Sequence, residues 1–94
     1  MEIDKDTVIV RSDGPVGTSI PGETVILDPA KGVYFGLDGV GARVWELLAN
    51  PIRYGDLIDT LDAEYEVDRA TLEADIRALL ANLTDAGLTG KDPS

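Results

Sequence analysis

Carboxylates are the only side chains with catalytic chemistry that this chain carries in number. It has 18 aspartates and glutamates, and it has neither histidine nor cysteine. Histidine is the commonest general base near neutral pH and the commonest metal ligand, and cysteine supplies the thiol nucleophile. Without them no nucleophile–base pair, cysteine zinc site or disulfide can be assembled. The sequence therefore predicts a protein that is not an enzyme and has no catalytic residues.

Eight of the carboxylates gather between residues 54 and 75, where Arg69 is the only base. They are Asp56, Asp59, Asp62, Glu64, Glu66, Asp68, Glu73 and Asp75. An EF-hand takes its calcium ligands from alternate positions around a central glycine, but this run has no glycine after Gly55. We interpret the run as a solvated helix face and expect no metal site. Asp56, Asp59 and Asp62 share nearby faces and offer an alternative, a docking surface for a basic partner.

Three glycines and three serines raise the question of a cofactor. Gly36, Gly39 and Gly41 read Gly-x-x-Gly-x-Gly, whereas a dinucleotide-binding loop reads Gly-x-Gly-x-x-Gly within a βαβ unit. We interpret them as turn glycines at a strand–helix joint. An acyl carrier protein needs a serine at a helix start for its phosphopantetheine arm, and Ser12, Ser19 and Ser94 are all placed elsewhere. No cofactor is therefore expected.

The charge of the chain restricts its partners. A net charge of −10 repels nucleic acid phosphates and anionic membrane surfaces. There is no run of about 18 apolar residues that would span a membrane. The acidic start, residues 1–6, lacks the basic flank and apolar stretch of a signal peptide. We expect a cytoplasmic protein that binds neither nucleic acid nor membrane.

The first 38 residues contain the expected strands. Apolar and β-branched residues at 8–10, 23–27 and 33–37 predict three short strands, with a loop at 13–17. The last two strands are about five residues apart, which suits an antiparallel hairpin. A three-stranded open sheet has two edges with unpaired backbone donors and acceptors.

From residue 39 onward the apolar period changes from two to about 3.6. It predicts helices over residues 40–49 and 55–64, and a third that starts after Asp68 and ends before Gly87. Asp38 and Asp68 are expected to be N-caps, and Gly87 a left-handed C-cap. Three strands followed by three helices predict an α+β fold. We expect one domain over residues 1–90 and a frayed, disordered tail that includes residues 91–94.

Alternation along the third expected strand assigns its two faces. Val33, Phe35 and Leu37 should face the helices, and Tyr34 should face outward beside a sheet edge. Phe35 and Trp45, the only phenylalanine and the only tryptophan, are expected in the core. The apolar stripe of the third helix is wider than a strict seam, which leaves part of it free to line a groove.

Five segments in this order and spacing resemble the PqqD-like family of precursor-peptide recognition domains. They are VILD (25–28), VYFGLD (33–38), GARVWELL (41–48), AEYEVD (63–68) and LEADIRALLANL (72–83). The resemblance covers about residues 8–88. Within the family the chain is most similar to the stand-alone leader-binding protein of lasso peptide biosynthesis, and next to the protein of pyrroloquinoline quinone synthesis.

The resemblance implies a winged helix-turn-helix fold that binds a leader peptide as an extra strand, in a groove walled by the third helix. It implies peptide-binding residues on the third strand and third helix: Val33, Tyr34, Phe35, Gly36, Leu37, Leu72, Asp75, Ile76, Leu79 and Leu83. Three partners stay open for Asp75, namely a basic leader residue, Arg43 or Arg77. The implied partners are a precursor peptide, a separate cysteine protease that removes the leader, and a macrolactam-forming cyclase.

Two alternatives remain. The first is a peptide chaperone for pyrroloquinoline quinone or another modified peptide, which shares the binding mode. The second, from another class, is a winged-helix DNA-binding regulator. That reading needs a basic third helix, whereas Arg69 and Arg77 stand there against Glu73, Asp75 and Asp85.

Overall fold

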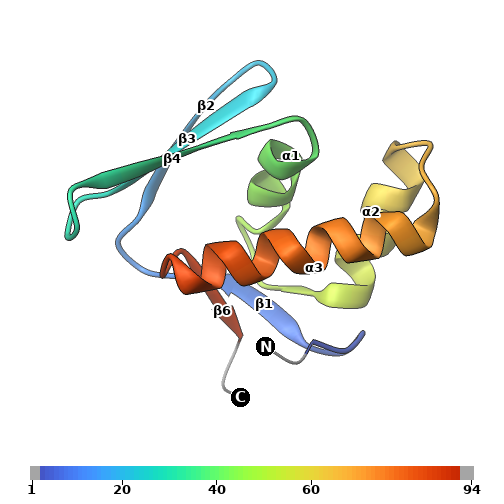
Figure 1. Ribbon diagram of the computed structural model, residues 1–94. Coiled ribbons are helices and arrows are strands. Elements are labelled where there is room, and N and C mark those ends of the chain that lie inside the picture. The colour runs from blue at the N-terminus through green and yellow to red at the C-terminus, as the bar shows by residue number, and fades with distance from the viewer. Residues whose placement is uncertain (1–2, 92–94) are drawn as a thin grey trace.

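The computed structural model describes residues 3–91 and shows two small antiparallel sheets and three helices (Figure 1). The elements in chain order are β1 (Val8–Arg11), β2 (Val16–Ile20), β3 (Glu23–Asp28), β4 (Val33–Asp38), α1 (Gly39–Leu47), β5 (Ile52–Arg53), α2 (Tyr54–Glu64), α3 (Arg69–Asp85) and β6 (Thr89–Lys91). In the view of Figure 1, α3 runs between the β2–β3–β4 sheet and the strands β1 and β6. Among the described residues no helix is long and apolar enough to cross a membrane.

The two sheets confirm the α+β class, but the sheet that contains the predicted hairpin has a different third strand from the one expected. The expected hairpin is present as β3 and β4, which are antiparallel neighbours. Its third member is β2, whose residues 16 and 17 were expected in a loop, and the sheet order is β2-β3-β4. β1 was expected in this sheet but pairs instead with β5 and β6. β5 and β6, with two and three residues, are too short to show alternation, so no pattern in the sequence indicates this second sheet.

The three helices follow the prediction to within about two residues at each end. Asp68 caps α3, because its carboxylate accepts a hydrogen bond from the Thr71 N–H at 3.1 Å. Gly87 has the expected left-handed backbone, with φ of 80°. The N–H of Leu88 then bonds to the carbonyl of Leu83 at 2.8 Å, which closes a Schellman motif. Asp38 occupies the N-cap position of α1, but its side chain makes no capping hydrogen bond.

This difference between the two caps predicts different costs of removal. Asp68→Ala is expected to lower the free energy of unfolding by about 1 kcal/mol, since it leaves a helix N–H without its acceptor. Asp38→Ala at the equivalent position of α1 serves as the matched control and should cost much less. Urea denaturation followed by circular dichroism would measure both. Equal losses for the two variants would contradict this assignment of the caps.

The core consists of two clusters of buried apolar side chains. The first joins β1 to the helices and contains Ile3, Ile9, Val44, Leu48, Tyr54, Leu57, Ile58, Leu61, Leu72, Ile76 and Leu80. The second, made of Ile26, Trp45, Leu83 and Leu88, attaches the β2–β3–β4 sheet to α1 and α3. Leu79 packs against both clusters. The predicted core position of Trp45 is confirmed, and Phe35 is half-buried against the second cluster.

Trp45 is the centre of the second cluster. It is 2% exposed, and the guanidinium of Arg11 stacks on its ring at 4.2 Å from the centroid. Arg11 also donates a hydrogen bond to the carbonyl of Trp45, and burial lowers the pKa of this arginine. A Cβ at Gly17 would lie 2.5 Å from the indole Nε1. Glycine is therefore needed where β2 crosses Trp45.

The chain stays ordered further than expected at its C-terminal side. Lys91, which was expected in the disordered tail, lies in β6 opposite Ile9, and Gly90 beside it lies opposite Val10. Residues 92–94, the rest of the expected tail, lie outside the described residues.

Candidate functional site

β4 is the outermost strand of its sheet, with β3 on one side and no described strand on the other. Gly39 lies opposite Gly22, one residue beyond the pair formed by Asp38 and Glu23. The Gly39 N–H donates a hydrogen bond to the Gly22 carbonyl at 3.3 Å, so these two residues are a hydrogen-bonded pair. Bonded and non-bonded pairs alternate along an antiparallel ladder. It follows that Val33, Phe35 and Leu37 bond to β3.

The same alternation directs the N–H and C=O groups of Tyr34, Gly36 and Asp38 away from β3. All three residues are exposed. The described chain thus leaves a free edge with backbone donors and acceptors ready to pair with another strand.

An apolar strip lies beside this edge on the side of the helices. Phe35 and Leu37 on β4 and Leu79 on α3 are each half-buried and pack against the second cluster. Leu37 and Leu79 meet over the backbone of Gly41, where a Cβ would lie 3.6 and 3.9 Å from their Cδ2 atoms. The strand edge and α3 therefore flank a common apolar surface.

The predicted helix residues divide between this surface and the core. Leu72, Ile76 and Leu83 are at most 3% exposed and belong to the core clusters. Leu79 is half-buried and Asp75 is exposed. The structure thus leaves Asp75 and Leu79 at the surface of α3, and it places the other three in the core.

Two further residues share the face of Asp75 and Leu79. Asn82 and Ala86 follow at the spacing that keeps residues on one helix stripe. The Ala86 carbonyl accepts a hydrogen bond from Lys31 Nζ at 3.1 Å, which ties the β3–β4 turn to the end of α3. The helical spacing from Leu79 could have identified Asn82 in the sequence, whereas the Lys31 contact had no sequence signal.

Asp75 pairs with neither of the two arginines considered for it. Arg43 binds Glu64 through Nε and Nη2, at 2.8 and 2.7 Å, and this hydrogen bonding lowers the pKa of the Glu64 carboxyl. Arg77 donates to the Ile3 carbonyl at 2.7 Å and stacks on the Tyr54 ring. Asp75 forms no ion pair within residues 3–91. Within the described residues the structure excludes both arginines as its partner, and pairing with a basic leader residue stays a prediction.

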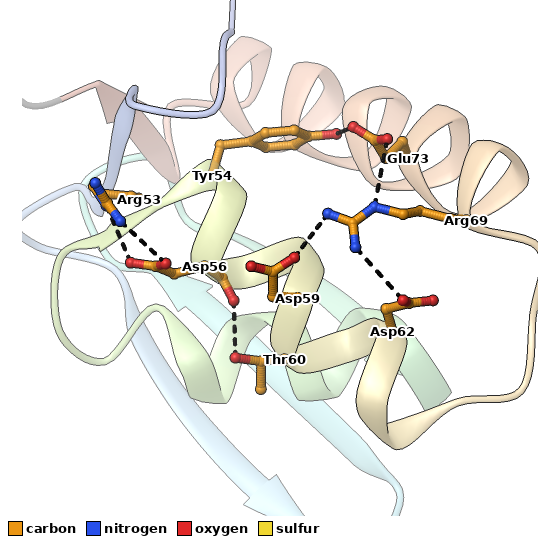
Figure 2. A network of polar contacts seen from close by, with 8 residues as sticks. All are labelled: Arg53, Tyr54, Asp56, Asp59, Thr60, Asp62, Arg69 and Glu73. Atoms are coloured by element: carbon orange, nitrogen blue, oxygen red, sulfur yellow. Dashed lines mark hydrogen bonds and ion pairs between the residues drawn. The ribbon is translucent and has the colours of Figure 1, made fainter.

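The acidic run is largely engaged by arginines, as Figure 2 shows. Arg69 lies 2.7 Å from Asp59, 3.5 Å from Asp62 and 4.0 Å from Glu73. Arg53 holds Asp56 at 3.1 Å. The contacts of Arg69 with Asp59 and Asp62 tie α3 to α2. Because each of the three aspartates is held by an arginine, they are less available as a docking surface than expected. In the described part of the chain no group of three or more acidic side chains is placed to hold a metal ion.

The outer face of the β2–β3–β4 sheet carries exposed apolar side chains. Val16, Leu27 and Tyr34 form one row across the three strands, and they are 59%, 46% and 74% exposed. The outward position predicted for Tyr34 is therefore confirmed. The row itself could not be recognised in the sequence, because β2 was not expected there.

The chain is similar to one protein family and to two solved structures. A family model described as coenzyme PQQ synthesis protein D (PqqD) matches residues 23–88, which include β3, β4 and all three helices. The solved structure of TbiB1 in complex with the TbiA(beta) leader peptide is similar, with a TM-score of 0.81 and 40% identity, covering 90% of this chain and 96% of that one. A lasso peptide synthetase B1 complexed with its leader peptide has a TM-score of 0.77 and 27% identity, covering 87% and 96%. No curated protein sequence matches significantly.

Proposed function

This chain belongs to the PqqD family, and on that premise we propose that it binds the leader segment of a ribosomally synthesised precursor peptide. The free edge of β4 is the observation that carries the proposal, because it offers the backbone groups of Tyr34, Gly36 and Asp38 to an added strand. Two similar structures contain leader peptides, and one of them is a lasso peptide synthetase B1. A lasso peptide precursor is therefore the proposed ligand.

The binding mode is β-augmentation. Main-chain hydrogen bonds to β4 fix the register of the peptide, and alternate side chains find pockets that give specificity. Half of the peptide side chains would face the apolar strip of Phe35, Leu37 and Leu79. A disordered leader loses conformational entropy when it docks, so an edge that is already formed favours binding.

We further propose that the chain delivers its cargo to a separate leader peptidase and a cyclase. Its own role is non-catalytic, as the lack of histidine and cysteine favours. Holding the leader near the peptidase raises the effective concentration of the substrate without new contacts to the scissile bond. A peptide chaperone for pyrroloquinoline quinone synthesis would use the same edge, and the nature of the bound precursor distinguishes the two.

Amide hydrogen exchange on the complex tests strand addition directly. Labelled protein would be mixed with the TbiA(beta) leader peptide and followed by NMR. The amides of Tyr34, Gly36 and Asp38 should exchange fast in the free protein and slowly in the complex. Those of Phe35 and Leu37 should be protected in both states, because they already bond to β3. Binding that leaves the first three amides unprotected would rule out β4 as the binding strand.

Asp75 is expected to contribute through charge. We expect Asp75→Asn to weaken leader binding about two- to fivefold at low salt, the scale of a partly exposed ion pair. The difference should vanish at high salt, where such pairs are screened. Fluorescence polarisation would measure it, with Asp85→Asn as the matched control on α3. If the same loss appears for a leader whose lysines and arginines are all replaced by glutamine, Asp75 does not act by pairing with a base.

A further inference from the structure

A hollow opens on the β2–β3–β4 sheet at its free edge. It is lined by Glu23, Thr24, Val25, Gly36, Leu37 and Asp38. Within it Gly36 stands directly opposite Val25, and Asp38 stands directly opposite Glu23. Gly36 contributes no side chain, so the hollow includes the space that a side chain at this position would occupy.

The chain itself does not require glycine at residue 36. The φ angle of Gly36 is not in the left-handed region, and a Cβ there would meet nothing within 4 Å. Gly17 differs, since a Cβ at that position would collide with Trp45. Glycine inside a strand weakens it and often marks a place where a ligand or another backbone approaches closely. Nothing in the described chain therefore requires glycine at this position, and the close approach of another molecule to β4 would account for it.

The rim of the hollow determines which chemistry would fit it. Glu23 and Asp38 are both exposed and face each other across β3 and β4, an arrangement in which like charges repel. Neither forms an ion pair within residues 3–91. Val25, next to them, is 43% exposed and provides an apolar wall. An aliphatic stem that ends in a cation complements both features.

We propose that the hollow is a specificity subsite for an arginine or lysine of the peptide strand that adds to β4. The inference rests on the proposed function. The residue directly opposite Gly36 would point to the outer face, with its Cβ about 5 Å from the glycine. Its stem crosses the space above Gly36 and packs on Val25, and its charged end lies between Glu23 and Asp38. This subsite reads the outward residues of the leader, whereas the strip at Leu79 reads the inward ones.

The test begins with a selection, because it requires no knowledge of the natural precursor. Random peptides displayed as a library would be selected for binding to the wild-type chain. The chain has no cysteine, so Gly36→Cys introduces a single thiol. Disulfide trapping with peptides that carry one cysteine at each position in turn then identifies the peptide residue opposite Gly36.

We expect this peptide residue to be arginine or lysine in the selected binders. Replacing it with methionine, which keeps an apolar stem, should weaken binding about five- to tenfold by fluorescence polarisation. In the protein variant Glu23→Gln/Asp38→Asn that loss should fall below about twofold. Glu66→Gln removes a carboxylate between α2 and α3, far along the chain from the hollow, and should leave the loss unchanged.

A second variant separates the side-chain subsite from the backbone pairing. Gly36→Val fills the hollow and suits a strand, so selected peptides should still bind through the edge but lose their preference for the basic residue. An equal methionine effect in the wild type and the Glu23→Gln/Asp38→Asn variant would overturn the subsite while strand addition stands. If no peptide can be trapped at residue 36, and none protects the amides of Tyr34 and Asp38, strand addition itself fails and the subsite fails with it.

Discussion

Tyr34→Pro is expected to reduce leader binding at least about tenfold while the fold stays intact. The N–H of Tyr34 points away from β3 and the side chain is 74% exposed, so the substitution removes neither a hydrogen bond of the sheet nor packing in the core. Proline lacks the N–H that an added strand would accept from, and its ring occupies the edge. Fluorescence polarisation with the labelled TbiA(beta) leader peptide measures the effect.

Tyr34→Ala is the matched control, because it removes the aromatic ring and keeps the N–H. It should retain most of the affinity. Val33→Pro is a weaker choice, since the N–H of Val33 bonds to β3 and its loss would disturb the hairpin itself. Circular dichroism checks that the variants are folded. A folded Tyr34→Pro protein that binds as well as Tyr34→Ala would exclude strand addition at this part of β4.

Trp45→Ala is expected to lower the free energy of unfolding by about 3–5 kcal/mol. The indole is almost fully buried at the centre of the cluster that attaches the β2–β3–β4 sheet to the helices. Its removal also deprives Arg11 of the ring on which it stacks. Small domains are stable by only about 5–15 kcal/mol, so much of the margin would disappear.

Urea denaturation followed by far-UV circular dichroism measures this loss without depending on tryptophan fluorescence. Trp45→Phe keeps most of the apolar volume and should cost less. Val67→Ala, at a position that is 47% exposed, should change the stability by less than about 0.5 kcal/mol. A loss for Trp45→Ala similar to that for Val67→Ala would show that the sheet does not depend on this cluster.

The sequence predicted the elements whose pattern is strong and local. β3, β4 and the three helices show clear apolar periods, and Asp68 and Gly87 mark the ends of α3 with residue types that have specific capping geometry. β2 was missed because Gly17 weakens its strand character, and the need for that glycine comes from Trp45, which is distant in the sequence. β5 and β6 exist only because β1 lies between them.

The candidate site was predictable in outline, as an open strand edge, and not in its side chains. The open edge of the third expected strand followed from a small sheet, and the structure shows β4 at such an edge. A helical period cannot show which side of a wide stripe is covered, so Leu72 and Ile76 could not be separated from Leu79. The partners of Arg43 and Arg77 are 21 and 74 residues away in the chain. The sequence therefore could not show that both arginines bind elsewhere and leave Asp75 without an ion pair within residues 3–91.

The pairing of Ile9 with Lys91 bears on how the chain folds. Almost the whole chain lies between these residues, and closing so long a loop early would sacrifice the most conformational entropy. The β2–β3–β4 hairpins and the helices rest on local contacts and should form first, while β1 meets β6 late. The side chain of Ile9 packs in the first core cluster, so its burial depends on the helices and not on β6. A nascent or truncated chain without β6 would instead leave one edge of β1 with unpaired backbone donors and acceptors, the kind of edge on which another chain can pair.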